Sequence, residues 1–138
     1  MKVEIERKND AVYLEATNEQ GIVIKMDGSP EIGGQNLGAR PMQLLLMGLG
    51  GCTSMDILSM LKKMREDVKS YKVLVDAERA KEHPMVFTKI HIHFIFEGDI
   101  KTANIEKAIN LSMEKYCSAT HILNKTATIT HTYEVINE

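Results

Sequence analysis

The sequence has few cysteines and no concentration of charge, and both features exclude whole classes of protein. Its 2 cysteines, Cys52 and Cys117, lie far apart and do not form the framework of a disulfide-rich secreted domain. They are also too few for a tetrahedral zinc site made of cysteines alone. The 17 Lys and Arg residues are interspersed with 19 Asp and Glu residues. This argues against a nucleic-acid-binding face and gives no support for binding to an anionic membrane.

The sequence also lacks an export signal and a long uninterrupted apolar run. Its first residues, Met1–Glu6, alternate and carry charge, unlike a signal peptide. The longest apolar run, Met42–Cys52, is interrupted by Gln43 and by glycines, and it is shorter than the ~20 residues that a membrane span needs. We therefore expect a soluble, cytoplasmic protein that does not bind membranes. With 43% hydrophobic residues, one domain over residues 1–138 needs no disulfide or structural metal.

Alternating apolar and polar residues predict strands, and apolar residues at helical spacing predict two helices. The expected strands are residues 1–8, 11–17, 22–26, 68–80, 86–97 and 126–134. The expected helices are residues 42–65 and 104–117, with a glycine-rich loop over 27–39 and a turn over 118–124. The order βββ-α-ββ-α-β, with strands grouped as hairpins, predicts an α+β fold rather than a doubly wound sheet.

The first expected helix is unusual because it contains Gly48, Gly50 and Gly51 and is apolar on every side in its first half. Each glycine in a helix interior is unfavourable by about 1 kcal/mol, so a kink or a close approach of backbone or ligand is expected there. A kink would fold the helix into two halves. The interpretation that we favour is that a second copy of the chain covers the helix in an obligate homodimer. We expect the methionines of this helix mainly to fill the core rather than to wall a pocket.

The two cysteines admit two interpretations. Each can be a buried small hydrophobic residue, since free cysteine is among the most buried residue types. Alternatively they are a reactive pair. If the helix breaks at the glycines, Cys52 lies at the start of a new segment whose dipole favours a thiolate, although Asp56 one turn later would oppose ionisation if it faced the thiol. Cys117 is expected at the end of the second helix, where the dipole has the opposite sign. One activated and one unactivated thiol suit peroxide reduction followed by disulfide formation.

Two stretches resemble the two cysteine motifs of the OsmC/Ohr (osmotically inducible protein C-like) family. Residues 40–56 read RPMQLLLMGLGGCTSMD and resemble the first motif, and residues 114–123 read EKYCSATHIL and resemble the second. The order of strands and helices is similar to that of the family along the whole chain. The Arg-Pro-Met start and the Tyr-Cys-Ser end most resemble its less characterised, YhfA-like branch.

This resemblance implies an intertwined homodimer that reduces organic hydroperoxides at sites in the dimer interface, in defence against oxidative stress. It implies that Cys52 is the peroxidatic cysteine and Cys117 the resolving cysteine, with an external dithiol as reductant and without a cofactor or metal. In the peroxidase branches a glutamate follows the motif proline and pairs with an arginine at the thiol, whereas this chain has Met42 there. Arg40, or Arg7 near the first turn, is expected to stabilise the thiolate in place of that pair.

Two other functions remain open from the sequence. One is a non-catalytic protein that binds a hydrophobic small molecule in an apolar dimer cleft, and the other is a redox sensor that signals through a Cys52–Cys117 disulfide. His91 and His93 share one strand face and would need a third ligand to hold a metal, so we expect an exposed polar face there instead. The sequence contains no nucleophile elbow, P-loop, dinucleotide fingerprint or paired zinc motif.

Overall fold

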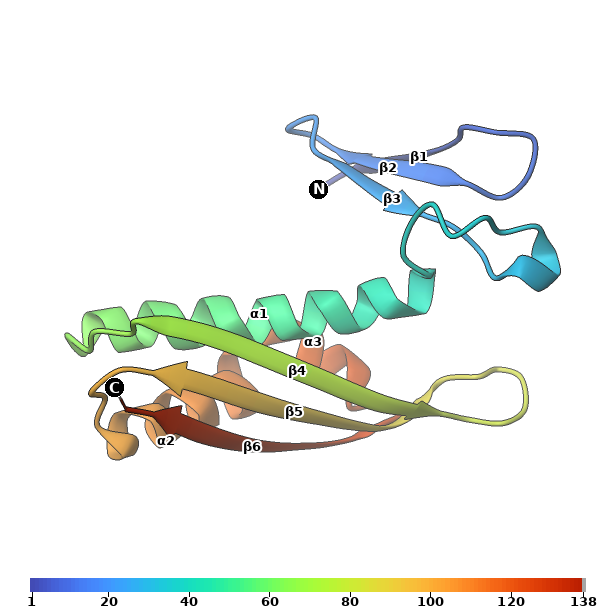
Figure 1. Cartoon of the computed structure of the whole chain (residues 1–138). Helices are drawn as coiled ribbons and strands as arrows, with labels where there is room; N and C mark the ends of the chain where they lie inside the picture. Colours follow the sequence, from blue (N-terminus) through green and yellow to red (C-terminus); the bar gives the residue numbers. More distant parts are fainter. Residues whose placement is uncertain (138) are drawn as a thin grey trace. The chain divides into compact units, whose positions relative to one another are not determined.

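The computed structural model describes residues 1–137 and shows a mixed α+β fold (Figure 1). The strands are β1 (Val3–Arg7), β2 (Leu14–Asn18), β3 (Val23–Met26), β4 (Ser70–Arg79), β5 (Phe87–Glu97) and β6 (Thr128–Ile136). The helices are α1 (Pro41–Lys63), α2 (Thr102–Leu111) and α3 (Ser118–Leu123), with a 3₁₀ turn η1 (Pro30–Ile32) and a π-helical turn η2 (Ser112–Tyr116). The predicted α+β class and all six expected strands are confirmed.

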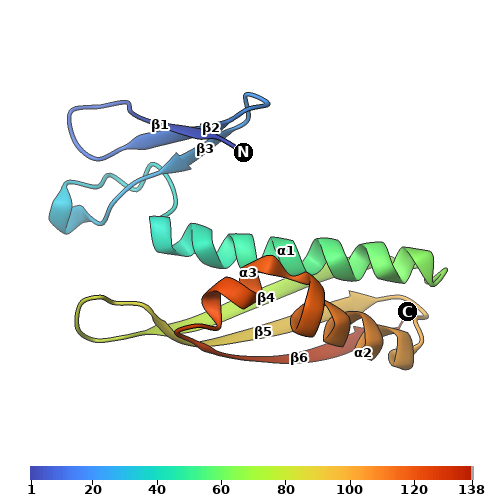
Figure 2. The same ribbon diagram turned by 180° about the vertical axis from the view of Figure 1, so that it is seen from behind.

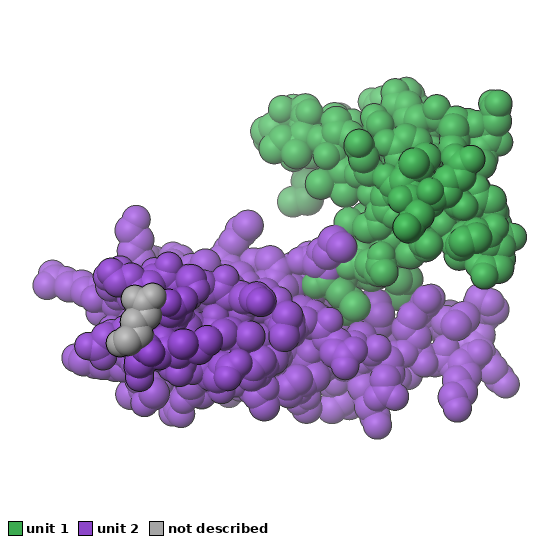
Figure 3. Space-filling model, in the orientation of Figure 1, with its two compact units in different colours: residues 1–46 green, residues 47–138 purple. Residues whose placement is uncertain are grey.

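The chain divides into two compact units, residues 1–46 and residues 47–138 (Figure 3). Each unit has its own three-stranded sheet, β1-β2-β3 in the first and β4-β5-β6 in the second. The expectation of one domain over residues 1–138 stays a prediction.

The first unit begins with an antiparallel meander whose second turn is closed by Asn18. The side-chain Oδ1 of Asn18 accepts hydrogen bonds from the backbone N–H groups of Gln20 and Ile22, at 3.1 and 2.9 Å. Gly21 completes the turn with a φ of +82°, a conformation that glycine adopts without steric strain. The polar turn between two alternating runs therefore positions β3 beside β2, as the sequence predicts.

The glycine-rich loop after β3 is organised around the buried carboxylate of Asp27. This carboxylate accepts hydrogen bonds from the backbone N–H groups of Gly28, Gln35 and Leu37, at 2.8, 3.0 and 3.1 Å. The hydrogen bond from Gln35 is the largest of the effects that lower the pKa of Asp27, and the charge of Arg40 acts in the same direction. The loop is therefore a folded element rather than a loose connection.

The second unit is a sheet with α1, α2 and α3 on one of its faces, as the front and back views show (Figures 1 and 2). β4 and β5 form an antiparallel hairpin, and β6 returns parallel to β5 after the crossover through α2 and α3. The two-residue period of β5 places its buried apolar side chains on the helix side, and these are Ile90, Ile92, Phe94 and Phe96. His91 and His93 therefore lie on the opposite face, as predicted.

Helix α1 runs without a break from Pro41 to Lys63, so a kink at the glycines is wrong. Glycine keeps its backbone N–H, so the ladder of helical hydrogen bonds continues through it. A Cβ atom at Gly50 would lie 3.2 Å from Cγ2 of Val75, so glycine here allows the helix to pack closely on β4. A Cβ atom at Gly48 or Gly51 would meet nothing within 4 Å. The predicted close approach is thus confirmed for Gly50.

One face of α1 is apolar and exposed. Met47 is 58% exposed and Met55 is 76% exposed, so the prediction that methionines mainly fill the core is wrong for these two residues. The helix is also long and apolar enough to cross a membrane. The sequence did not predict this, because the apolar run that ends at Cys52 is shorter than the whole helix. Core helices of soluble proteins meet the same criterion of length and composition, so it does not by itself indicate a membrane span.

The region around Cys117 differs from the expected single helix followed by a turn. Helix α2 ends at Leu111, and the chain continues as η2, in which the Cys117 N–H donates to the Ser112 carbonyl oxygen at 2.8 Å. Cys117 is extended, with φ −78° and ψ 102°, and is the N-cap of α3. Cys117 therefore precedes a helix rather than ending one. The predicted turn over 118–124 is wrong because Ser118–Leu123 form that helix.

Candidate active site

The fold brings the two cysteines together on the helix side of the second sheet. Cys52 lies in the middle of α1 and is half-buried, whereas Cys117 lies between η2 and α3 and is fully buried. Their Sγ atoms and a carboxylate oxygen of Asp56 all lie within 4.8 Å of one another. The two thiols, which no pattern in the sequence showed to meet, therefore lie close together within one chain.

Each member of this thiol–carboxylate cluster, defined as Cys52, Asp56 and Cys117, is positioned by local backbone structure. Cys52 and Asp56 are four residues apart on α1, so their side chains share one helix face. On the opposite side, the π-helical turn η2 and the extended backbone of Cys117 direct its thiol toward α1. Single π-helical turns occur frequently at functional sites, where the widened turn redirects a side chain.

The unbroken helix changes the electrostatic expectation for Cys52. Because no new helical segment starts at the glycines, the predicted stabilisation of a thiolate by a helix N-terminus does not apply to this residue. The geometric condition stated for Asp56 is met, since its carboxylate does face the thiols. The arrangement therefore places an acceptor of protons, rather than a helix dipole, beside Cys52.

The environment of Cys117 disfavours the charged form of its thiol. Burial is the main cause that raises the pKa of Cys117 above its ordinary value, and a hydrogen bond with Cys52 raises it further. The backbone N–H of Thr120 donates to Cys117 Sγ at 3.3 Å and partly offsets this effect. The prediction that Cys117 is the unactivated thiol agrees with this direction, although the cause is burial and not a helix C-terminus.

Asp56 is held in place by a polar partner from the other side of the site. The Ser112 hydroxyl donates a hydrogen bond to Asp56 Oδ2 at 3.0 Å. Ser112 is fully buried and belongs to η2, so the bond links α1 to the turn that carries Cys117. The sequence indicated Asp56 only as an unfavourable charge, and no pattern in it pointed to Ser112 or Thr120. The four-residue spacing from Cys52 was the signal that placed Asp56 on the thiol face.

A pocket of about 490 Å³ adjoins Asp56. Its lining is mainly apolar and includes one methionine in the last turn of α1 and one directly after the helix. The lining residues are Asp56, Ser59, Met60, Lys63, Met64, Leu111 and Tyr116. The methionines Met60 and Met64 thus line a pocket, the role that sequence reasoning ranked second for this helix. A pocket of this size can hold a small apolar molecule next to the carboxylate.

The predicted arginines belong to the first unit. Arg7 Nε donates to the Ala11 carbonyl oxygen at 2.8 Å, within the first turn of the meander. Arg40 lies at the start of α1, where its backbone N–H donates to Gln43 Oε1 at 2.9 Å. A role of either arginine beside Cys52 stays a prediction.

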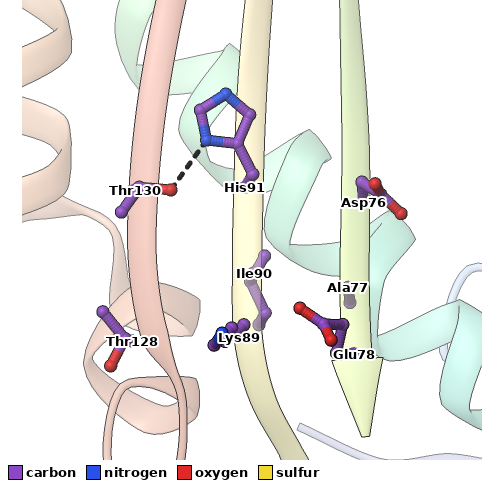
Figure 4. A pocket seen from close by; sticks show the side chains of 8 residues that line it. All are labelled: Asp76, Ala77, Glu78, Lys89, Ile90, His91, Thr128 and Thr130. Atoms are coloured by element: carbon purple, nitrogen blue, oxygen red, sulfur yellow. Dashed lines mark hydrogen bonds between the residues drawn. The ribbon is translucent and has the colours of Figure 1, made fainter.

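A second cluster of polar side chains lies on the other face of the sheet, beside a pocket of about 350 Å³ (Figure 4). The residues that line this pocket come from β4, β5 and β6, and they are Asp76, Ala77, Glu78, Lys89, Ile90, His91, Thr128 and Thr130. His91 Nδ1 and Nε2 lie 2.7 Å and 2.9 Å from the hydroxyls of Thr130 and Thr132. His93 likewise contacts Thr132 and Glu134. The ring nitrogens of both histidines are thus already hydrogen-bonded, in agreement with a polar strand face.

Comparisons with known proteins agree with the motifs and the fold. The profile of the OsmC family, described as OsmC-like protein, matches residues 33–132. Protein YhfA of Escherichia coli (strain K12) is 46% identical over 97 residues, which are 70% of this chain and 72% of YhfA. A crystal structure of a hypothetical protein from Aquifex aeolicus VF5 is 30% identical with a TM-score of 0.86, over 99% of this chain and 96% of that one.

A structure with much lower sequence identity has a similar fold. The organic hydroperoxide resistance protein OsmC from Legionella pneumophila has a TM-score of 0.71 at 11% identity, over 96% of this chain and 95% of that one. The profile match spans most of the chain and covers both cysteines of the thiol–carboxylate cluster, and the identity to YhfA extends over more than two thirds of each protein. This chain therefore belongs to the OsmC-like protein family.

Proposed function

We propose that this protein is a thiol-dependent peroxidase that reduces organic hydroperoxides through Cys52 and Cys117. The observation that carries the proposal is that the two sulfur atoms, from α1 and from the junction of η2 and α3, lie within 4.8 Å of each other. A related fold belongs to the Legionella pneumophila protein named for organic hydroperoxide resistance. The cytoplasm, where dithiols stay reduced, is the compartment in which such a pair can be recycled.

In the first step the thiolate of Cys52 attacks one oxygen of the peroxide. A sulfur–oxygen bond forms, the O–O bond breaks, and the departing alkoxide takes a proton and leaves as an alcohol. Cys52 then carries a sulfenic acid. Cys52 is assigned the attacking role because it is half-buried, whereas Cys117 is fully buried and its pKa is raised by that burial.

In the second step the sulfur of Cys117 attacks the sulfur of the Cys52 sulfenic acid. A disulfide forms, the sulfur–oxygen bond breaks, and the hydroxide leaves as water after taking the thiol proton. The sulfurs, which lie within 4.8 Å of each other in the reduced chain, must approach to about 2.05 Å for the disulfide to form. An external dithiol then gives two electrons to the disulfide and restores both thiols.

Asp56 supports these steps by accepting the Cys52 proton as the sulfur attacks the peroxide, so that the carboxylate is neutralised and does not oppose the thiolate. Its carboxylate oxygen lies within 4.8 Å of both sulfurs, and the hydrogen bond from Ser112 fixes its orientation. A positioned carboxylate acts as a general base when it lies within hydrogen-bond reach of the proton, directly or through one water.

The pocket beside Asp56 favours an apolar substituent on the peroxide. Met60, Met64, Leu111 and Tyr116 supply its apolar walls. Methionine side chains adapt to ligands of different shape, so several alkyl or aryl hydroperoxides would fit. The same pocket also supports the alternative function of a protein that binds a hydrophobic small molecule without catalysis.

A homodimer is part of this proposal because the apolar face of α1 is exposed, and a second copy of the chain would bury it. Met47 and Met55 on this face are more than half exposed, and Gly48 and Gly51 leave open space between them. Large exposed apolar patches mark interaction sites, and glycines permit a close approach of a second helix. Sedimentation analysis should give a dimer for the native chain and a monomer for Met55→Lys, and a native monomer would contradict this part.

The test of the proposed activity is a single turnover. The reduced protein is mixed with one equivalent of cumene hydroperoxide, and free thiols and intact mass are followed over seconds to minutes. We expect rapid loss of both thiols and a mass decrease of two hydrogens. Thiols that remain unchanged would contradict a peroxidase and favour the binding protein. Rapid oxidation without turnover in excess dithiol would favour a redox sensor.

A further inference from the structure

The thiol–carboxylate cluster also contains the ligand atoms that a thiophilic divalent cation prefers. We propose that the reduced protein binds one Zn²⁺ ion through Cys52 Sγ, Cys117 Sγ and a carboxylate oxygen of Asp56. The sequence led us to expect no metal because two cysteines alone do not make a zinc site. The fold adds the third ligand atom by bringing Asp56 within 4.8 Å of both sulfurs.

The spacing of the ligand atoms suits a tetrahedral ion. Zinc binds sulfur at about 2.3 Å and carboxylate oxygen at about 2.0–2.2 Å, so ligand atoms in a tetrahedral site lie about 3.5–3.8 Å apart. The three atoms lie within 4.8 Å of one another before any adjustment to an ion. Rotation of the Cys52 side chain, which is half-buried, would bring its sulfur toward the other two ligand atoms.

The chemistry of the donors favours zinc over harder cations. Two thiolates and one carboxylate together offer three negative charges, and thiolate ligands select zinc over magnesium or calcium. As each metal–sulfur bond forms, the thiol releases its proton to solvent. The partly exposed side of Cys52 leaves a fourth position for water, an arrangement with three protein ligands that is common in zinc sites.

The groups around the ligands are those that orient a metal site. The Thr120 N–H donates to Cys117 Sγ at 3.3 Å, and the Ser112 hydroxyl donates to Asp56 Oδ2 at 3.0 Å. Hydrogen bonds of this kind fix the direction of ligand lone pairs and stabilise the charge of a bound thiolate. The two donors, both buried, come from the same short segment that carries Cys117.

Zinc binding goes beyond the proposed peroxidase and does not depend on it. The metal needs only reduced thiols, and no oxidant takes part in its binding. Because the ion and the peroxide require the same sulfur of Cys52, a bound ion protects the thiol from oxidation. Metal occupancy would therefore switch the site between a protected state and a reactive state.

The test is an anaerobic titration of the reduced, metal-free chain with Co²⁺ as a spectroscopic probe for Zn²⁺. We expect a thiolate-to-cobalt charge-transfer band that saturates at one equivalent and disappears when Zn²⁺ is added. Zinc affinity is then measured by competition with a chromophoric chelator. Asp56→Asn should weaken zinc binding by at least about tenfold, the loss typical of disturbed metal sites. The matched control Asp76→Asn, on the exposed side of β4, should bind zinc like the native chain.

Several outcomes would overturn the metal site. Absence of the charge-transfer band in the native chain would do so, as would equal affinities of the native chain and Asp56→Asn. Circular dichroism of each variant checks that the fold is intact, and Ser112→Ala, which keeps all three ligands, should weaken binding about tenfold. Peroxide oxidation of the metal-free chain is measured separately. A positive result there with no cobalt band would overturn only the metal site, and the reverse would overturn only the peroxidase.

Discussion

The two faces of the sheet β4-β5-β6 each carry a cluster of titratable side chains. The clusters differ in how completely their polar atoms are paired by hydrogen bonds. On the outer face, His91 and His93 have hydrogen-bond partners at both ring nitrogens, supplied by threonine hydroxyls and Glu134 of β6. On the helix side, the two thiols of the thiol–carboxylate cluster lie near a carboxylate. Thiols form only weak hydrogen bonds, so these groups keep their capacity to react or to bind a metal.

The difference shows that residue type alone does not identify a site. Histidines at alternate positions of a strand are a usual metal pattern, yet the parallel register with β6 places a hydroxyl or carboxylate beside each ring. The thiol–carboxylate cluster instead combines residues from α1 and from the segment after α2, where Ser112 donates to Asp56 and Thr120 donates to Cys117. Side chains that are fully paired stabilise the sheet, whereas incompletely paired groups are available for chemistry. This contrast between the two faces can be tested with substitutions on each of them.

Substitution of the attacking thiol should have the largest effect. Cys52→Ser should lower the rate of peroxide reduction by at least about a thousandfold, since removal of a covalent nucleophile abolishes its pathway. The measurement is peroxide consumption with excess dithiol, with His91→Ala as the control from the outer face. Retained turnover in Cys52→Ser would assign the chemistry to another group.

Removal of the carboxylate should have a smaller but clear effect. Asp56→Asn should lower kcat/KM for an organic hydroperoxide by about 100-fold, within the usual contribution of a general base. Asp76→Asn makes the same change of charge on the outer face and should leave kcat/KM unchanged. If both variants behave like the native chain, Asp56 takes no part in proton transfer.

The buried thiol should show its raised pKa in alkylation. In Cys52→Ser the remaining thiol is Cys117, and its reaction with iodoacetamide should rise with pH through a midpoint above the ordinary value of 9.0, mainly because of burial. The raised pKa contributes stability that is fully present below the unfolded value and is lost as pH rises through the folded-state value. An alkylation midpoint below 9.0 would mean that Cys117 is the activated thiol.

Substitution of His91, on the face of the sheet opposite the thiols, should lower the stability of the fold and leave the rate of thiol oxidation nearly unchanged. His91→Ala removes two hydrogen-bonded contacts from a half-buried position and should lower the free energy of unfolding by about 1 kcal/mol. The rate of thiol oxidation by peroxide should change by less than about twofold, since no reacting group contacts this face. Urea denaturation and the single-turnover assay measure the two quantities. A large loss of oxidation rate would place a second functional site on the outer face.

Much of the fold follows from local pattern, and the errors have identifiable causes. The alternation from Phe87 to Glu97 predicts both the strand and which side chains enter the core. The kink at the glycines was wrong because packing of Gly50 against Val75 accounts for the residue without breaking the helix. The predicted end of the second helix, at Cys117, was wrong because the spacing of apolar residues does not distinguish a π-helical turn from an α-helix.

Local pattern is enough to predict the strands, the long apolar helix, the polar face of β5 and the two cysteine motifs, because these depend on the periodicity and chemistry of neighbouring residues. The packing of the folded chain was needed to show that Cys52 and Cys117 meet, that Asp56 lies beside both sulfurs, and that Ser112 and Thr120 donate hydrogen bonds to this cluster. Apart from the local contact of Thr120 with Cys117, these contacts join segments about 60 residues apart, and their geometry depends on how α1 packs against the turn after α2 rather than on any local pattern.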